Sequence, residues 1–178
     1  ILGPEMKSTV EVMGVDDTFG MAFLKSQHGA GQILPEKGTV FISLRNKDKR
    51  AMIFLAKKLV DLGFELLATR GTAKALARND IEVKEVLKVS QGRPNIVDKM
   101  KNGEIALIIN TPAGKGTHPD GLAIRSNAVA LKIPLITTVA GAYAAVNGIE
   151  ALKKLGFQVK SLHEYGLRYE NPHKAARG

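Results

Sequence analysis

The sequence predicts an α/β fold of the doubly wound class, in which helices cover both faces of a mainly parallel, five-stranded sheet. Three observations lead to this prediction. Short apolar segments alternate with longer segments whose apolar residues recur at helical spacing. The connections between them are short and rich in turn-forming residues. Residues 105–109 (IALII) are almost continuously apolar, which is typical of a strand buried on both faces. Strands and helices that alternate in this way indicate a parallel sheet.

Five strands and five helices are expected from residue 39 onward. The predicted strands cover residues 39–44, 65–68, 82–89, 105–109 and 134–137, and residues 157–162 are the candidate for a last, edge strand. The predicted helices cover residues 49–62, 72–78, 95–102, 120–131 and 140–155. Each strand is therefore followed by a helix that can return the chain to the start of the next parallel strand.

Local signals mark where several of these helices begin and end. Gly63 is placed to end the first of them. Pro94 suits the first position of the helix over 95–102, and Asp120 suits the N-cap of the helix that follows the fourth strand. Gly148 interrupts the pattern of the last helix.

Residues 1–38 differ from the rest of the chain. Asp16 or Asp17 is a candidate N-cap for a short helix that ends near Gly29. We interpret 1–38 as the end of a preceding domain with its linker helix, 39–165 as the α/β domain, and 166–178 as a flexible basic tail. Because the first residue is not methionine, we expect the chain to be a piece of a longer protein.

The composition limits the function classes. The chain has 178 residues, a formal net charge of +9 and no cysteine, so disulfides and thiol catalysis are excluded. No apolar run approaches the roughly 20 residues of a membrane-spanning helix, and we expect a cytoplasmic protein without a membrane partner. The positive charge suits an anionic ligand. Aromatic residues make up only 5% and offer few stacking surfaces, which argues against nucleic acid as the partner.

Polar and cationic side chains follow the predicted strands at their carboxyl ends, the edge at which doubly wound folds bind ligands. The candidates are Ser43, Lys49, Thr69, Thr72, Lys88, Asn110, Thr111, Thr137 and Thr138. Hydroxyl, amide and ammonium groups that converge beside helix N-termini are suited to a phosphate group. The same residue types also cap helices and form turns. Thr72 suits an N-cap and Gly71 suits a turn with positive φ, so the sequence is compatible with both interpretations.

Acid–base chemistry has weaker support in the sequence. His118 and Asp120 lie in the segment THPDG, where they form either an acid–base pair or a loop histidine beside a helix cap. We find no Ser-His-Asp arrangement and no cluster with metal-ligand spacing. A polar, cationic pocket of this kind suits binding better than catalysis, so we predict no catalytic residue, metal ligand or cofactor in this chain.

Five segments resemble the carboxyl-terminal allosteric domain of carbamoyl-phosphate synthetase large chains, which has the methylglyoxal-synthase-like fold. They read LRNKDK, GFELLATRGTAKAL, GRPNIVDKMKNGEIALIINTP, AIRSNAVALKIPLITT and SLHEY, and they lie within residues 38–165. The preceding MKSTVEVMGVDDTFGMAFLKSQ resembles the end of the second ATP-grasp half of the same family and its link to the allosteric domain. The two matches are adjacent and in the family's order, which makes the resemblance specific.

The resemblance implies a regulatory role, in which a phosphorylated nucleotide such as UMP or IMP binds at the carboxyl ends of the strands. It implies phosphate contacts from Lys49, Thr69, Thr72 and Lys88, nearby contacts from Ser43, Asn110 and Thr111, and an ornithine side at Thr137 and Thr138. It also implies a parent enzyme that makes carbamoyl phosphate for pyrimidine and arginine biosynthesis. That enzyme uses ATP with Mg²⁺ or Mn²⁺, acts with upstream synthetase domains and a glutaminase small chain, and forms an oligomer.

Two other functions are compatible with parts of the sequence. Methylglyoxal synthases act on dihydroxyacetone phosphate with an aspartate in a GGD motif, and this chain has Gly92-Arg93-Pro94 at that place. His118-Pro119-Asp120 resembles part of their downstream HDPD motif, with the histidine shifted. A lyase of that kind is therefore the first alternative. A basic nucleic-acid binder is the second, and it predicts binding that depends steeply on salt.

Overall fold

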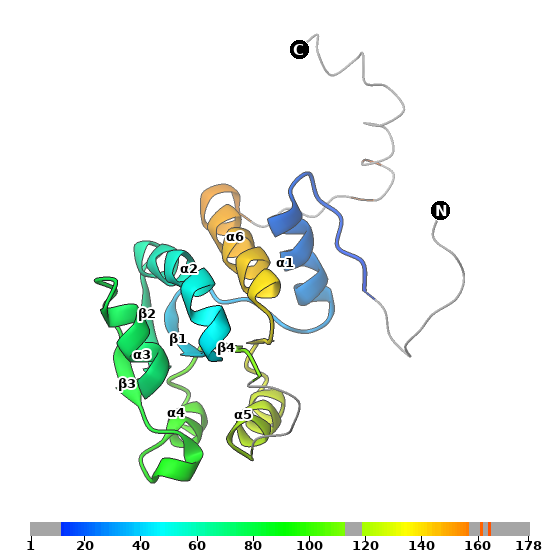
Figure 1. Cartoon of the computed structure of the whole chain (residues 1–178). Coiled ribbons are helices and arrows are strands. Elements are labelled where there is room, and N and C mark those ends of the chain that lie inside the picture. Colours follow the sequence, from blue (N-terminus) through cyan, green and yellow to red (C-terminus); the bar gives the residue numbers. More distant parts are fainter. Residues whose placement is uncertain (1–11, 113–118, 157–160, 162–163, 165–178) are drawn as a thin grey trace.

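A five-stranded parallel sheet forms the centre of the molecule in the computed structural model, which describes residues 12–112, 119–156, 161 and 164 (Figure 1). The strand order is β3-β2-β1-β4-β5, and every neighbouring pair is parallel. The strands are β1 (Gly38–Ser43), β2 (Phe64–Thr69), β3 (Lys84–Val86), β4 (Leu107–Asn110) and β5 (Leu135–Ile136). The predicted doubly wound class is confirmed. The candidate edge strand over 157–162 lies almost wholly outside the described residues.

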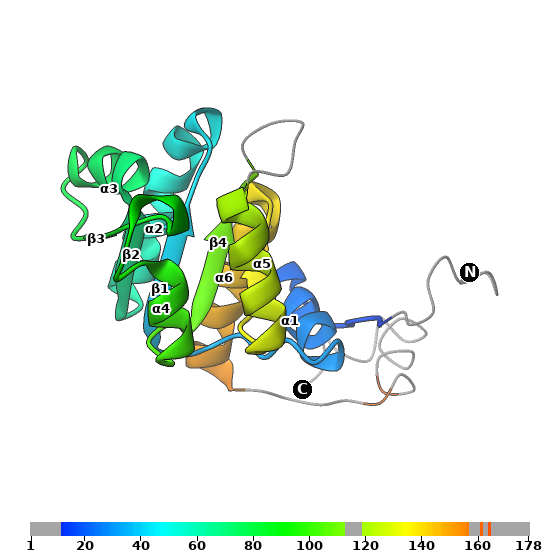
Figure 2. The ribbon, with the colours of Figure 1, turned by 90° about the horizontal axis from the view of Figure 1, so that it is seen from below.

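Helices cover both faces of this sheet (Figure 1 and Figure 2). The helices are α1 (Phe19–Gly29), α2 (Lys49–Asp61), α3 (Arg70–Ala77), α4 (Ile96–Lys101), α5 (Pro119–Ala130) and α6 (Val139–Leu155), with 3-10 turns η1 (Asn46–Asp48) and η2 (Val89–Gln91). One core lies between the sheet and α1, α2, α3 and α6, and a second core lies between the sheet and α4 and α5. The three-layer arrangement leaves the carboxyl ends of the strands uncovered by either layer.

Strand β1 shows why the strand sequences are almost continuously apolar. Val40 and Ile42 point into the first core, whereas Phe41 points into the second, and all three side chains are fully buried. A central parallel strand needs apolar residues at every position because helices cover both of its faces. Strand β3 lies at the edge of the sheet, where Lys84 and Glu85 are exposed. It is correspondingly shorter than the predicted 82–89.

Three helices begin with a cap from a side chain, and in two of them the cap differs from the predicted signal. Thr18 caps α1 by accepting from Met21 N at 3.3 Å, whereas Asp16 forms an ion pair with Lys25. Asn95 caps α4 by accepting from Val97 N at 2.9 Å, so the helix begins at Ile96 and not at the residue after Pro94. Thr138 caps α6 by accepting from Gly141 N at 3.0 Å.

Helix α1 packs against α6 at two glycines (Figure 1). A methyl group added at Gly148 would lie 2.6 Å from the carbonyl oxygen of Gly20. The glycine that interrupts the pattern of α6 therefore allows the two backbones to approach closely. Leu24 of α1 belongs to the same core as the sheet. The division of the chain into three parts stays a prediction, and the structure adds that α1 is packed on the sheet domain.

Within the described residues, no helix combines the length and the apolar character needed to cross a membrane. The same residues contain no group of three or more His, Cys, Asp or Glu side chains that could hold a metal ion.

Candidate functional site

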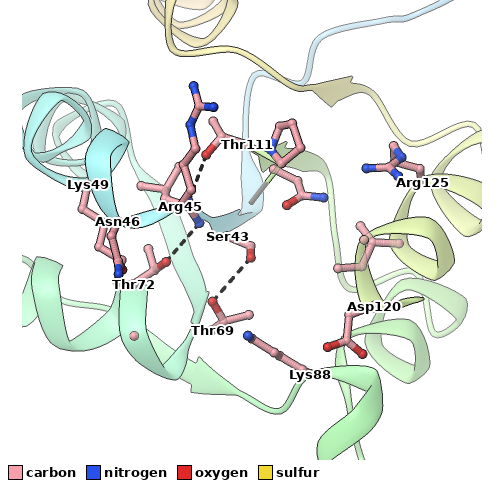
Figure 3. Close-up of a pocket in the computed structure, with 16 residues that line it drawn as sticks. Ser43, Arg45, Asn46, Lys49, Thr69, Thr72, Lys88, Thr111, Asp120 and Arg125 are labelled. Atoms are coloured by element: carbon pink, nitrogen blue, oxygen red, sulfur yellow. Dashed lines mark hydrogen bonds between the residues drawn. The ribbon is translucent and has the colours of Figure 1, made fainter. Parts of the chain in front are cut away.

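A cavity of about 400 Å³ opens at the carboxyl ends of the strands, between the N-termini of α2 and α3 on one side and α5 on the other (Figure 3). Seven of the nine predicted site residues line it: Ser43, Lys49, Thr69, Thr72, Lys88, Asn110 and Thr111. Thr137 and Thr138 do not line it; they follow β5, and Thr138 is the N-cap of α6. Three polar or charged residues that were not predicted also line the cavity: Arg45, Asn46 and Arg125. Asp120, the candidate member of an acid–base pair, lines it as well.

The two threonines around Gly71 do not cap α3. The helix begins at Arg70, so Thr72 lies within its first turn and Thr69 occupies the N-cap position. Thr72 Oγ1 accepts from the backbone N of Leu44 at 3.1 Å, and Thr69 Oγ1 donates to Ser43 Oγ at 3.5 Å. No side chain accepts from the first N–H groups of α3. The interpretation of Thr72 as an N-cap is therefore wrong.

Helix α2, whose N-terminus also lines the cavity, likewise lacks a cap from a side chain. Turn η1 runs directly into α2, and neither Arg45 nor Asp48 caps the turn or the helix. The first turn of α2 has no acidic residue and begins with Lys49 and Arg50. Cations at a helix N-terminus are unfavourable, because the helix dipole places positive charge there. Neither N-terminus has a side-chain cap, and residues of both line the cavity.

Gly71 provides room for a lysine and does not serve as a left-handed turn. Its φ is not among the positive values of the chain, which corrects the prediction from sequence. A methyl group added at Gly71 would lie 3.2 Å from Lys49 Nζ. The ammonium group therefore lies beside the first turn of α3, where it also donates to Asn46 Oδ1 at 2.8 Å. One ammonium group and one helix N-terminus face the same space.

Asp48 organises the loop between β1 and α2. It is 8% exposed, and its Oδ2 accepts from Arg45 Nε at 2.6 Å. Burial raises the pKa of Asp48, but the hydrogen bonds from Arg45 and Thr111 and the charges of Arg45 and Lys47 outweigh it and hold that pKa below its ordinary value. Thr111 Oγ1 also accepts from the backbone N of Arg45 at 3.1 Å. The carboxylate thus ties the end of β4 to the start of α2.

Asp120 closes the opposite wall of the cavity. Helix α5 begins at Pro119, so Asp120 lies within its first turn and is not the predicted N-cap. Its two carboxylate oxygens accept from Ser90 N at 2.9 Å and from Ser90 Oγ at 2.8 Å. This pair of hydrogen bonds joins η2 to α5. The remainder of the predicted THPDG segment, His118 included, lies outside the described residues.

Three polar groups of the cavity wall have no protein partner among the described residues. Lys88 and Arg125 form no ion pair or side-chain hydrogen bond with described residues. Asn110 is 5% exposed, and its buried Nδ2 has no hydrogen-bond partner. A buried donor without a partner costs about 1–3 kcal/mol. The cavity therefore contains more donors and positive charge than the described protein groups satisfy.

Sequence reasoning could have found some of the unpredicted residues. Arg45 and Asn46 lie between Ser43 and Lys49, which were both predicted. Their position in the same loop after β1 is the signal that they belong to the site. Arg125 is in the middle of a helix, where no turn or strand end marks it. Its signal is helical spacing, because Gly121, Ile124 and Arg125 lie on one face of α5 and all line the cavity.

A model of the MGS-like domain, which corresponds to the fold predicted above, matches residues 51–137. This protein has an MGS-like domain. It is also 54% identical over 166 residues to the carbamoyl phosphate synthase large chain of Archaeoglobus fulgidus, a match that covers 93% of this chain and 15% of that protein. It is 54% identical over 165 residues to the carboxyl-terminal section of the carbamoyl phosphate synthase large chain from Methanopyrus kandleri, covering 92% of this chain and 30% of that protein. The resemblance inferred from the sequence is confirmed.

Both relatives are much longer than this chain. The chain spans 15% of the length of the first and 30% of the length of the second. Among solved structures, a methylglyoxal synthase from Elizabethkingia anophelis is similar with a TM-score of 0.53 and 21% sequence identity. That match covers 64% of this chain and 79% of the other. At this level of identity the similarity concerns the fold alone.

Proposed function

We propose that this MGS-like domain is a regulatory domain that binds a phosphorylated nucleotide, such as UMP or IMP, in the cavity at the carboxyl ends of the strands. The parent protein in this proposal is a glutamine-hydrolysing carbamoyl-phosphate synthetase of the cytoplasm. Its ATP-dependent synthetase domains lie upstream, and it works with a glutaminase small chain. The similarity to the carbamoyl phosphate synthase large chains supports this context. The proposal also includes ornithine binding near Thr137 and Thr138, outside this cavity.

The observation that carries the proposal is the pair of uncapped N-termini that face one cavity. Helix α3 and the η1–α2 segment both lack caps from side chains there. A phosphate group can accept from several free backbone N–H groups at once and is favoured by the positive end of the helix dipole. The hydroxyls of Thr69 and Ser43 lie beside these N-termini (Figure 3). This set of donors suits a phosphate better than it suits a neutral ligand.

The charges around the cavity support the same ligand class. Lys49 and Lys88 have no carboxylate partner among the described residues, and both line the cavity. Hydrogen bonds between such cations and phosphate oxygens are charge-assisted and are stronger than neutral ones. In an allosteric enzyme, the binding free energy controls activity only through a difference in affinity between two states, typically about 1–3 kcal/mol.

The lyase alternative finds no support in the described part of the cavity. It needs a carboxylate that can remove a proton from dihydroxyacetone phosphate. Of the described residues that line the cavity, Asp120 alone has a carboxylate, and both of its oxygens accept from Ser90. Release of phosphate from dihydroxyacetone phosphate by the purified chain is the result that would restore this alternative.

Isothermal titration of the chain with UMP, IMP and inorganic phosphate tests the proposal. We expect saturable binding of a nucleotide that is tighter than binding of phosphate. Lys49→Gln should lower nucleotide affinity about ten-fold or more, because a hydrogen bond to a charged group contributes about 1.5–3 kcal/mol.

Lys57→Gln is the matched control, because Lys57 lies exposed on the same helix and does not line the cavity. It changes the net charge equally and should leave the affinity unchanged. Absence of nucleotide binding by the folded chain, or equal losses in both variants, contradicts the proposal.

A further inference from the structure

We propose that Asp48 is a positioning residue for the ligand of this cavity. From behind the cavity wall, its carboxylate holds Arg45 and thereby the loop that leads into the η1–α2 segment. Arg45 in turn neutralises a carboxylate that would otherwise repel an anion. This inference rests on the proposed function, because it takes an anion to bind at the N-terminus of that segment.

Asp48 is a buried carboxylate beside the cavity that does not line it. Asn46 and Lys49 line the cavity on either side of it in the sequence, whereas Asp48 is 8% exposed and lies behind them. It directly precedes α2, yet its side chain makes no cap bond to that helix. The carboxylate is therefore neither a ligand contact nor a helix cap, and its role follows from the groups that it does contact.

Asp48 joins two segments of the chain that meet at the cavity wall. Its Oδ2 accepts from Arg45 Nε at 2.6 Å, and the hydroxyl of Thr111 donates to the same carboxylate. Thr111 Oγ1 also accepts from the backbone N of Arg45 at 3.1 Å, and Thr111 N donates to Ser43 O at 3.0 Å. These hydrogen bonds form a closed set that fixes the start of the η1–α2 segment against the end of β4.

The side chain of Arg45 serves this set and not the ligand. In Figure 3 its guanidinium group extends away from Ser43, Thr69 and Thr72, the hydroxyl residues of the cavity. Among the described residues, Asp48 is the carboxylate with which Arg45 forms its ion pair. Opposite charges at this distance largely cancel for a ligand on the other side of the wall. The pair therefore orders the loop without adding a net negative charge behind the anion.

The charge of Asp48 makes positioning distinguishable from simple electrostatics. Burial raises the pKa of Asp48, but the hydrogen bonds from Arg45 and Thr111 hold that pKa below its ordinary value, so the carboxylate is charged at neutral pH. If Asp48 acted through its charge alone, removal of that charge would strengthen the binding of an anion. If Asp48 positions the loop, the same change weakens binding, because a mobile loop must be ordered when the ligand binds.

Isothermal titrations of the 178-residue chain with UMP and with inorganic phosphate test the inference. Asp48→Asn should lower the affinity for both ligands about ten-fold, although it removes a negative charge. Asp61→Asn is the control, because Asp61 is exposed at the other end of α2 and does not line the cavity. It should leave both affinities within about two-fold of wild type. A folded Asp48→Asn variant that binds as tightly as the wild type, or more tightly, overturns the inference and leaves the proposed function intact.

Arg45→Gln completes a double-mutant cycle and remains informative if Asp48→Asn does not fold. Arg45→Gln should lower UMP affinity about ten-fold more than Arg50→Gln. The second variant removes the same charge from an exposed residue of α2 that does not line the cavity. Equal losses in these two variants overturn the inference.

The double variant with Asp48→Asn and Arg45→Gln has the net charge of the wild type. Its UMP affinity should be no lower than that of Arg45→Gln, because both residues act through one contact. Two losses that add in the double variant would show that Arg45 and Asp48 act separately, and would overturn the inference. If the folded wild-type protein binds neither UMP, IMP nor phosphate, the proposed function fails and the inference fails with it.

Discussion

The helix N-termini of this MGS-like domain are of two kinds. Helices α1, α4 and α6 begin with a side chain that accepts from a backbone N–H of the first turn, provided by Thr18, Asn95 and Thr138. Helix α3 and the η1–α2 segment have no such cap; α3 begins with Arg70, and α2 begins with Lys49 directly after η1. The uncapped pair faces the cavity, and the capped three do not. Among these five N-termini, a side-chain cap is absent from the two that face the cavity.

This difference has an energetic meaning. A missing cap costs about 0.5–2 kcal/mol relative to a good one, and a cation in the first turn adds an unfavourable term of about 0.3–1 kcal/mol. Threonines were available at α3, but Thr72 Oγ1 accepts from Leu44 N and Thr69 occupies the N-cap position without capping. A bound phosphate would supply to both helices the acceptor that the protein withholds. The uncapped ends are a local loss of stability that the proposed ligand would offset.

The largest expected effect comes from giving α3 an anion of its own. In Gly71→Asp, the new carboxylate would lie at the first turn of α3 beside Lys49 Nζ, which is 3.2 Å from the position of the added Cβ. We expect nucleotide affinity to fall at least about 100-fold, because the carboxylate occupies the phosphate position and repels it. The free energy of unfolding should rise by about 1 kcal/mol without ligand. Isothermal titration and denaturant unfolding measure the two effects.

Gly71→Asn is the matched control for this change, because it adds the same bulk without a charge. It should retain at least about ten-fold more nucleotide affinity than Gly71→Asp. If the aspartate variant binds UMP as tightly as the wild type does, the N-terminus of α3 is not the anion site and the distinction between the two kinds of N-terminus loses its functional meaning.

The fold could be predicted because its determinants are local and repeated. Period-two and near-continuous apolar segments located the strands, and Gly63 with φ +86 ends α2 as expected. The caps could not be assigned from sequence, since Thr, Asp and Asn occur at several neighbouring positions and only the three-dimensional path decides which one caps. Thr18 caps α1 although Asp16 and Asp17 precede it, and Asp16 instead pairs with Lys25.

An effect of intermediate size is expected from replacing either of two threonines that occupy N-cap positions. Thr138 accepts from Gly141 N at 3.0 Å, whereas Thr69 makes no cap bond. We expect Thr138→Ala to lower the free energy of unfolding by about 1 kcal/mol and to leave nucleotide affinity unchanged. Thr69→Ala should show the reverse pattern, with a loss of affinity of about five-fold or more from one hydrogen bond. Equal effects of both changes on unfolding would remove the distinction between capped and uncapped ends.

The candidate site could be predicted where its residues lie at the end of a strand or at the start of the helix that follows. Ser43, Thr69 and Asn110 end strands β1, β2 and β4, so the topology alone brings them to one edge. The same rule also selected Thr138, which caps α6 and does not line the cavity. Arg125 was missed because its place in the cavity depends on how α5 packs on the sheet, and no local signal in the sequence contains that information.

The smallest expected effect on stability concerns Lys58 near the C-terminus of α2. This lysine forms an ion pair with Glu150, whereas Lys49 at the N-terminus has no carboxylate partner among the described residues. Lys154 and Lys58 form hydrogen bonds and ion pairs with Glu150, and they lower the pKa of Glu150 to about 2. A carboxyl group whose pKa is lower in the folded state stabilises the protein above its ordinary pKa, near 4.5. That stabilisation is lost as the pH falls from about 4.5 to about 2. Because the pair is partly exposed, we expect at most about 1 kcal/mol.

Denaturant unfolding of wild type and Glu150→Gln between pH 6 and pH 2.5 measures this contribution as the difference between the two curves. The variant should be less stable at pH 6, and the two proteins should converge toward pH 2.5. Glu36→Gln, which changes an exposed carboxylate outside this ion pair, should run parallel to the wild type. A constant gap between wild type and Glu150→Gln across this pH range would show that Glu150 contributes through packing. The two ends of α2 would then not differ in whether the charge of a lysine is stabilised by a carboxylate.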